Sequence, residues 1–151
     1  TCMILMIILG AHVFGYFFTL TQATQGLVAW VRALEIAPYA VLAFVVLLYL
    51  VLGCLLDQVA ILILTVPILL PLVVSLGFDP VWFGVLVIVV AEVGMVTPPV
   101  GLNVFVVARY TKRPIGEIFG GVWPHVFAHI LVIVLLIAFP SIVLWLPSTM
   151  R

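Results

Sequence analysis

Long, uninterrupted apolar stretches are the feature that most limits how this chain can fold. The first, residues 2–20, is apolar except for His12 and Thr19. Four more stretches follow, at 38–52, 58–76, 81–108 and 122–146. About 20 apolar residues in a helix cross the hydrocarbon core of a bilayer. Only 7% of the 151 residues are charged, too few for a water-soluble surface. The sequence therefore predicts an all-α, polytopic membrane protein.

The charge balance and the motifs that are missing exclude several function classes. Five basic and five acidic side chains give a net charge of zero, so no basic face is present to bind nucleic acid. Cys2 and Cys54 both lie in apolar runs, which does not fit a disulfide scaffold. The sequence contains no Ser-His-Asp set, no Gly-rich nucleotide loop and no dinucleotide fingerprint. We therefore expect neither an enzyme nor an organic cofactor.

The first residues carry no targeting signal. The chain begins with Thr1, and no basic residue precedes the first apolar stretch, as a secretory signal would require. We expect the chain to come from the interior of a longer protein and to run to that protein's C-terminus.

The fourth apolar stretch is interrupted by Gly94-Met-Val-Thr97-Pro98-Pro99-Val100-Gly101. A Pro-Pro pair does not continue an α-helix, and irregular backbone within a membrane is tolerated only inside protein or beside a cavity. In secondary transporters, the free carbonyls of such broken helices coordinate sodium. The pattern therefore predicts a cation site, rather than a proline kink that serves packing alone.

A second irregularity is the junction Gly53-Cys-Leu-Leu-Asp57. Only about 15 residues separate Pro38 from Gly53, which is short for a crossing. We favour a re-entrant hairpin over 38–76, although two full crossings remain an alternative. Asp57 is an ionisable group at the hairpin tip, the N-cap of the next helix, or both.

The basic residues indicate the orientation. Arg109, Lys112 and Arg113 follow the fourth stretch, and such clusters remain in the cytoplasm. The hairpin would then enter and leave the membrane from the outer side.

Three further residues support other functions. Glu92 lies two residues before the break and could carry a proton in a proton-coupled carrier. His125 and His129 are four residues apart and share a helix face, which is compatible with a membrane redox or metal-binding protein. For both features we favour the plainer interpretation, a structural or coupling role for Glu92 and an interfacial pair for the two histidines.

These motifs resemble one known family. The runs are Gly53-Cys-Leu-Leu-Asp57, Pro67-Ile-Leu-Leu-Pro71, Gly77-Phe-Asp-Pro-Val-Trp-Phe-Gly84 and Glu92-Val-Gly-Met-Val-Thr-Pro-Pro-Val-Gly-Leu-Asn-Val-Phe-Val106. From about residue 38 to 110 they resemble the C-terminal half of the large permease subunit (DctM-like) of tripartite ATP-independent periplasmic (TRAP) transporters.

The resemblance implies a multi-pass protein of the bacterial inner membrane that takes up a small organic anion, such as a C4-dicarboxylate or sialic acid, with sodium as the coupling ion. It implies an elevator mechanism, a periplasmic binding protein that delivers the substrate, a small membrane subunit and an N-terminal half of the large subunit. Residues 38–110 would be one inverted repeat, comprising hairpin 38–76 and broken helix 81–108. Residues 1–37 would be a transmembrane helix with an interfacial connector, and 111–151 a C-terminal transmembrane helix.

The resemblance also implies site residues. Sodium ligands would be provided, mostly through backbone oxygens, by Gly53, Gly94, Thr97 and Val100. Supporting or substrate-pocket residues would be Asp57, Pro98, Pro99, Gly101 and Asn103. This sequence has Val90 where many family members have Asn, and it has no first repeat, so this chain alone should not transport. A scaffold protein that kept the fold without transport is a further alternative.

Overall fold

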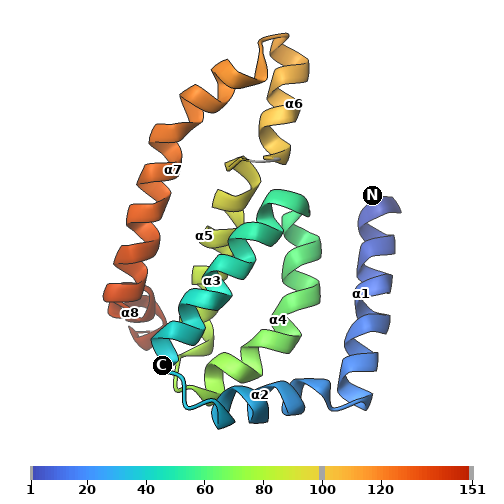
Figure 1. The fold of residues 1–151 in the computed structure, drawn as a ribbon, viewed down its shortest axis with the longest axis vertical. Coiled ribbons are helices and arrows are strands. Elements are labelled where there is room, and N and C mark those ends of the chain that lie inside the picture. The colour runs from blue at the N-terminus through green and yellow to red at the C-terminus, as the bar shows by residue number, and fades with distance from the viewer. Residues whose placement is uncertain (1, 99–100, 150–151) are drawn as a thin grey trace.

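The computed structural model describes residues 2–98 and 101–149, and over these residues the chain is helical with no strand (Figure 1). In chain order the helices are α1 (Cys2–Leu20), α2 (Ala23–Ala33), α3 (Pro38–Leu55), α4 (Gln58–Ser75), α5 (Pro80–Val96), α6 (Leu102–Thr111), α7 (Ile115–Ala138) and α8 (Ser141–Thr149). The expected all-α polytopic fold is confirmed.

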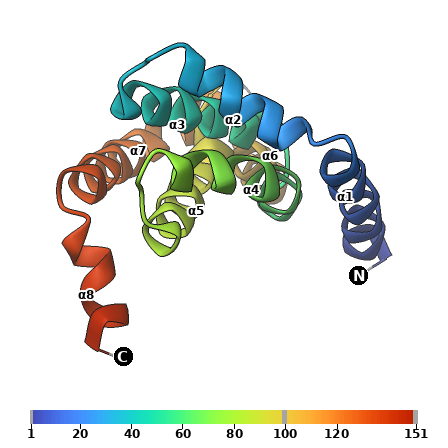
Figure 2. The ribbon, with the colours of Figure 1, turned by 90° about the horizontal axis from the view of Figure 1, so that it is seen from below.

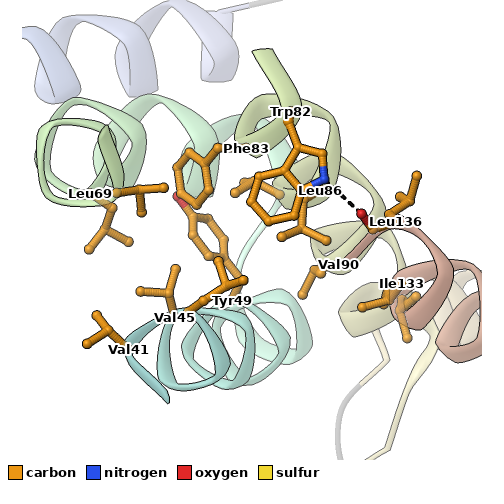
Figure 3. Packing of buried hydrophobic residues seen from close by; sticks show 14 of the residues in the cluster. Val41, Val45, Tyr49, Leu69, Trp82, Phe83, Leu86, Val90, Ile133 and Leu136 are labelled. Carbon is orange, nitrogen blue, oxygen red and sulfur yellow. Dashed lines mark hydrogen bonds between the residues drawn. The ribbon is translucent and has the colours of Figure 1, made fainter. Parts of the chain in front are cut away.

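Helices α3, α4, α5 and α7 share one apolar core (Figure 3). Its largest fully buried side chains include Trp82, Tyr49 and Phe83. The rings of Tyr49 and Phe83 meet edge to face, with 6.4 Å between their centroids. Because α5 lies between the α3–α4 hairpin and α7, it is the central helix of the bundle.

The α3–α4 hairpin differs in detail from the sequence-based expectation. Helix α3 continues through Gly53 to Leu55, so its 18 residues are more than the short arm that we expected. Helix α4 also has 18 residues and continues through Pro67 and Pro71, along a path that bends in Figure 1. Both prolines therefore lie inside a helix and do not end it.

The predicted helix break is present between α5 and α6. Asp79 starts α5, because its Oδ1 accepts hydrogen bonds from Val81 N at 2.8 Å and Trp82 N at 3.1 Å. Helix α5 ends at Val96, and α6 begins at Leu102 after Gly101, which has a left-handed φ of 54°. The break thus begins three residues after Gly94, which itself lies inside α5.

The last apolar stretch forms two helices. Helix α7 begins at Ile115, earlier than the expected start near Val122, and continues through Pro124. The chain then turns at Phe139 and Pro140 before α8. Because proline has no N–H, the carbonyl of Leu136 lacks its usual helical donor, and the buried Trp82 Nε1 donates to it at 2.8 Å.

The helix lengths are those of a multi-pass membrane protein. Helices α3, α4 and α7 are each long and apolar enough to cross a bilayer, and α5 is a shorter apolar helix. Residues Leu5–Leu20 and Ala23–Ala33 would pass the same test as one span that is bent by 61°.

The connector predicted at residues 21–37 contains α2, which lies across the lower ends of α3 and α4 (Figures 1 and 2). Arg32 Nη2 on α2 donates to the carbonyl oxygen of Ser75 at 2.8 Å, at the end of α4. A cation at the C-terminus of a helix is favourable because it faces the negative end of the helix dipole. This contact ties α2 to the hairpin.

Candidate functional site

The hairpin turn and the helix break meet backbone to backbone. A Cβ atom placed on Gly53 would lie 2.9 Å from Ala91 O and 2.9 Å from the Cα of Gly94. A Cβ atom on Gly94 would lie 2.9 Å from Leu50 O. Only glycine at both positions permits this approach, which brings the last turns of α3 and α5 together.

Beyond this contact, three backbone carbonyls surround the thiol of Cys54, one from α3 and two from the break. The buried sulfur lies 3.2 Å from Leu50 O, 3.6 Å from Thr97 O and 3.8 Å from Pro98 O. A thiol has one proton, and the shortest of these contacts is within its own helix. The oxygens of Thr97 and Pro98 therefore retain lone pairs directed at the hairpin turn.

The sequence of the break explains why carbonyls are available there. In a regular helix the carbonyls of residues 94 and 95 would accept from the N–H groups of residues 98 and 99, which are both proline. The oxygen of Gly94 accepts from Thr97 N at 3.2 Å instead. The Thr97 hydroxyl donates to Val93 O at 2.6 Å, which leaves its own oxygen able to bind a cation.

The far side of the break is held by Gly101 and α7. Gly101 is buried, and its carbonyl accepts from Val104 N at 2.8 Å. A Cβ on Gly101 would meet the Phe119 ring at 3.2 Å and Thr97 O at 3.3 Å. The structure therefore places Thr97 O between the hairpin turn and the start of α6, where Asn103 is half-buried.

The remaining predicted site residues lie at the periphery or outside the described part. Asp57 is exposed and caps α4, because its Oδ2 accepts from Val59 N at 3.2 Å. The N-cap interpretation of Asp57 is thus confirmed. Pro98 is exposed, and Val100 and Pro99 lie outside the described residues.

This arrangement is chemically suited to a hard, monovalent cation. It offers neutral carbonyl and hydroxyl oxygens from two helix ends, with the C-terminal, negative end of the α5 dipole directed at them. Among residues 2–98 and 101–149, no three His, Cys, Asp or Glu side chains converge as they would for a transition metal.

The residues that suggested a proton-coupled carrier or a metal-binding protein are exposed or half-buried. Glu92 is exposed on α5, on the side opposite the buried Ala91 and Val93. The rings of His125 and His129 are 4.2 Å apart between centroids, and His129 Nδ1 lies 3.1 Å from His125 O, so this ring nitrogen bonds within its own helix.

Sequence reasoning missed Cys54 and Phe119 as members of this region. Cys54 follows Gly53 directly, so its place at the turn was a signal that could have been used. No local signal marks Phe119, because its contact with Gly101 depends on how α6 and α7 fold back on each other.

Comparison with known proteins gives one consistent family. Residues 1–142 match the family described as "Tripartite ATP-independent periplasmic transporter, DctM component". The chain is 32% identical over 148 residues to the "C4-dicarboxylate TRAP transporter large permease protein DctM" of Pseudomonas aeruginosa, covering 98% of this chain and 35% of the relative.

Two further relatives have different substrates in their names. The chain is 33% identical to the "Sialic acid TRAP transporter large permease protein SiaM" of Vibrio cholerae, covering 98% of this chain and 35% of the relative. It is 32% identical to the "Ectoine/5-hydroxyectoine TRAP transporter large permease protein UehC" of Ruegeria pomeroyi, covering 95% and 34%. These relatives are named as permeases and not as enzymes, and the chain spans about a third of their length.

Proposed function

This chain belongs to the DctM family of tripartite ATP-independent periplasmic transporters, and from that premise we propose that it forms the C-terminal part of a large permease subunit. The complete subunit would import a small organic anion that carries a carboxylate, with sodium as the coupling ion. The three relatives named above differ in the substrate that their names give, so the family alone sets no finer specificity.

The observation that carries the proposal is the contact between the α3–α4 turn and the α5–α6 break. The Gly53–Gly94 approach joins them, and the carbonyls of Thr97 and Pro98 face the same point. We assign the sodium ion to this junction, bound by backbone oxygens of Gly53 and Gly94 and by the backbone and hydroxyl oxygens of Thr97. Val100 belongs to the proposed set through the family resemblance.

The proposed topology is supported by the level at which the hairpin turn ends relative to α6 and α7. Helix α7 has 24 residues and rises by about 36 Å, whereas each hairpin arm has 18 residues and rises by about 27 Å. Figure 1 shows α6 continuing beyond the hairpin turn to the top of α7. A turn that stops short of that level fits a re-entrant hairpin, with Arg109, Lys112 and Arg113 in the cytoplasm and the subunit in the inner membrane.

The proposed partners and motion rest on the family to which the chain belongs. Helices α3, α4, α5 and α7 share the core, and α1 packs directly against α4 and α2. From the family we propose an elevator mechanism in which residues 38–110 form the moving body. An N-terminal half, a small membrane subunit and a periplasmic binding protein would complete the transporter.

The test is the sodium dependence of uptake by the full-length subunit, reconstituted in liposomes with its small subunit and binding protein. Thr97→Ala removes a hydroxyl ligand, so the sodium concentration for half-maximal uptake should rise about tenfold, corresponding to about 1.4 kcal/mol of lost binding. Thr97→Ser retains the hydroxyl and should behave like the wild type.

Two results would overturn the assignment. If the sodium dependence of Thr97→Ala equals that of the wild type, the ion does not bind at this junction. If uptake by the wild type ignores sodium and follows pH, the carrier is proton-coupled, and Glu92 becomes the residue to examine.

A further inference from the structure

An apolar groove of about 420 Å³ lies between α2, α3 and α4, away from the junction of the hairpin turn and the helix break. All thirteen residues that line this α2–α3–α4 groove are apolar, among them Trp30 from α2, Phe44 from α3 and Leu72 from α4. Phe44 is 65% exposed, so the groove is open to its surroundings. Because the lining is apolar, the groove is a poor site for ordered water or for a polar solute.

The groove has the position and length of one lipid chain. Its lining includes residues of α2, which crosses the lower ends of α3 and α4 (Figures 1 and 2), and extends along α3 from Ala40 to Leu48. Between the lining residues Ala40 and Leu48, α3 rises by about 12 Å, close to the about 15 Å of hydrocarbon in one leaflet. A groove that leads from the membrane surface toward the midplane follows the direction of an acyl chain.

The surface end of the groove carries an aromatic anchor and a positive charge. Trp30 lines the groove and is 63% exposed, in the manner of residues at the level of the lipid headgroups. Arg32 is the only Lys or Arg in residues 1–108. Its guanidinium donates to Ser75 O, which holds it at the level of the helix ends and leaves other N–H donors for a phosphate.

We propose that the α2–α3–α4 groove binds one acyl chain of an anionic phospholipid, whose phosphate lies near Arg32. The chain fills the space between the amphipathic helix α2 and the hairpin, where an empty groove would forfeit van der Waals contacts. Bound in this way, the lipid joins the connector to the hairpin as part of the packed structure.

The first test counts bound lipids by native mass spectrometry, on the full-length protein in mild detergent with added phosphatidylglycerol. Ala40→Phe fills the groove, and Ala43→Phe adds the same ring on the same helix outside it. The wild type and Ala43→Phe should each retain one more lipid than Ala40→Phe. Equal counts for both variants would overturn the proposal.

The second test needs no variant in α3. Phosphatidylglycerol with brominated acyl chains should quench tryptophan fluorescence in the wild type more than in Trp30→Phe. If quenching is the same in both, Trp30 meets no lipid and another part of the protein covers the groove. Arg32→Gln, which can still donate to Ser75 O, should lose the preference for phosphatidylglycerol over phosphatidylcholine; an absent preference in the wild type would contradict the role of Arg32.

Discussion

A methyl group on Gly94 would lie 2.6 Å from the Cα atom of Gly53. No real side-chain carbon tolerates this distance. A Cβ atom has no rotamer in which to avoid the contact, and the atoms that it meets belong to the backbone. The hydrogen atoms that serve as the side chains of Gly53 and Gly94 therefore set how closely α3 and α5 approach. The same contact sets the distance between the hairpin turn and the helix break.

Gly94→Ala should therefore be one of the most damaging single-methyl changes in the chain. The helices must move apart, which costs about 1–3 kcal/mol in an overpacked core, and the oxygens of Thr97 and Pro98 would move away from the turn. We expect a lower midpoint of thermal unfolding in detergent and loss of sodium-dependent uptake.

Gly84→Ala is the matched control, because Gly84 lies on the same helix and a Cβ there meets nothing within 4 Å. Alanine is the better helix former, so this variant should be neutral or stabilised by up to about 1 kcal/mol. Equal unfolding midpoints for the two variants would show that the close approach of α3 and α5 is absent in the folded protein.

Trp82 and Pro140 are linked through the carbonyl of Leu136. Trp82→Phe removes the indole N–H that replaces the donor missing from Pro140, and it leaves a buried carbonyl without that partner. The expected cost is about 1–3 kcal/mol, measured as a loss in thermal or denaturant stability. Trp123→Phe, at a 46% exposed position on α7, should change stability little; a similar loss in both would exclude the hydrogen bond as the cause.

The two arms of the hairpin share one polar contact within the apolar core. The hydroxyls of Tyr49 and Thr65 are 2.7 Å apart, and Thr65 Oγ1 is 2.7 Å from Ile61 O. Because a carbonyl only accepts, Thr65 donates to Ile61, and Tyr49 donates to Thr65.

Tyr49→Phe should then cost about 0.5–1.5 kcal/mol. Thr65→Val should cost more, since it leaves the tyrosine hydroxyl buried without this acceptor. The two losses should not add in the double variant, which a double-mutant cycle on unfolding free energies measures. Full additivity would mean that the two hydroxyls do not interact.

The interruption of the fourth apolar stretch was predictable from the sequence because it follows from covalent chemistry. Pro98 and Pro99 remove backbone donors, and the helix ends at Val96 beside them. Pro67 and Pro71 have the same chemistry but lie inside α4. Proline is tolerated in a membrane helix when packing and neighbouring groups compensate for the lost bonds, and the sequence does not show that packing.

The sequence named candidate site residues but not their geometry. Gly53 and Gly94 were predicted as ligand positions, and the structure shows that they set the distance between two helices. Phe119 closes the region from α7, which begins several residues earlier than the apolar pattern indicates. Such contacts depend on how distant helices pack, and helical periodicity carries no information about them.

A substitution at Glu92 distinguishes a sodium-coupled transporter from a proton-coupled one. Its carboxylate is exposed on α5, and the junction's oxygens come from the backbone and from Thr97. Glu92→Gln keeps the shape of the side chain and removes its charge, so the sodium concentration for half-maximal uptake and the pH profile of uptake should both stay as in the wild type. Glu117→Gln, which removes an exposed carboxylate paired with Arg113 on the surface, is the matched control. If Glu92→Gln alone abolishes a pH dependence that the wild type shows, the coupling proton binds at Glu92, and the junction of α3 and α5 serves packing and not ion binding.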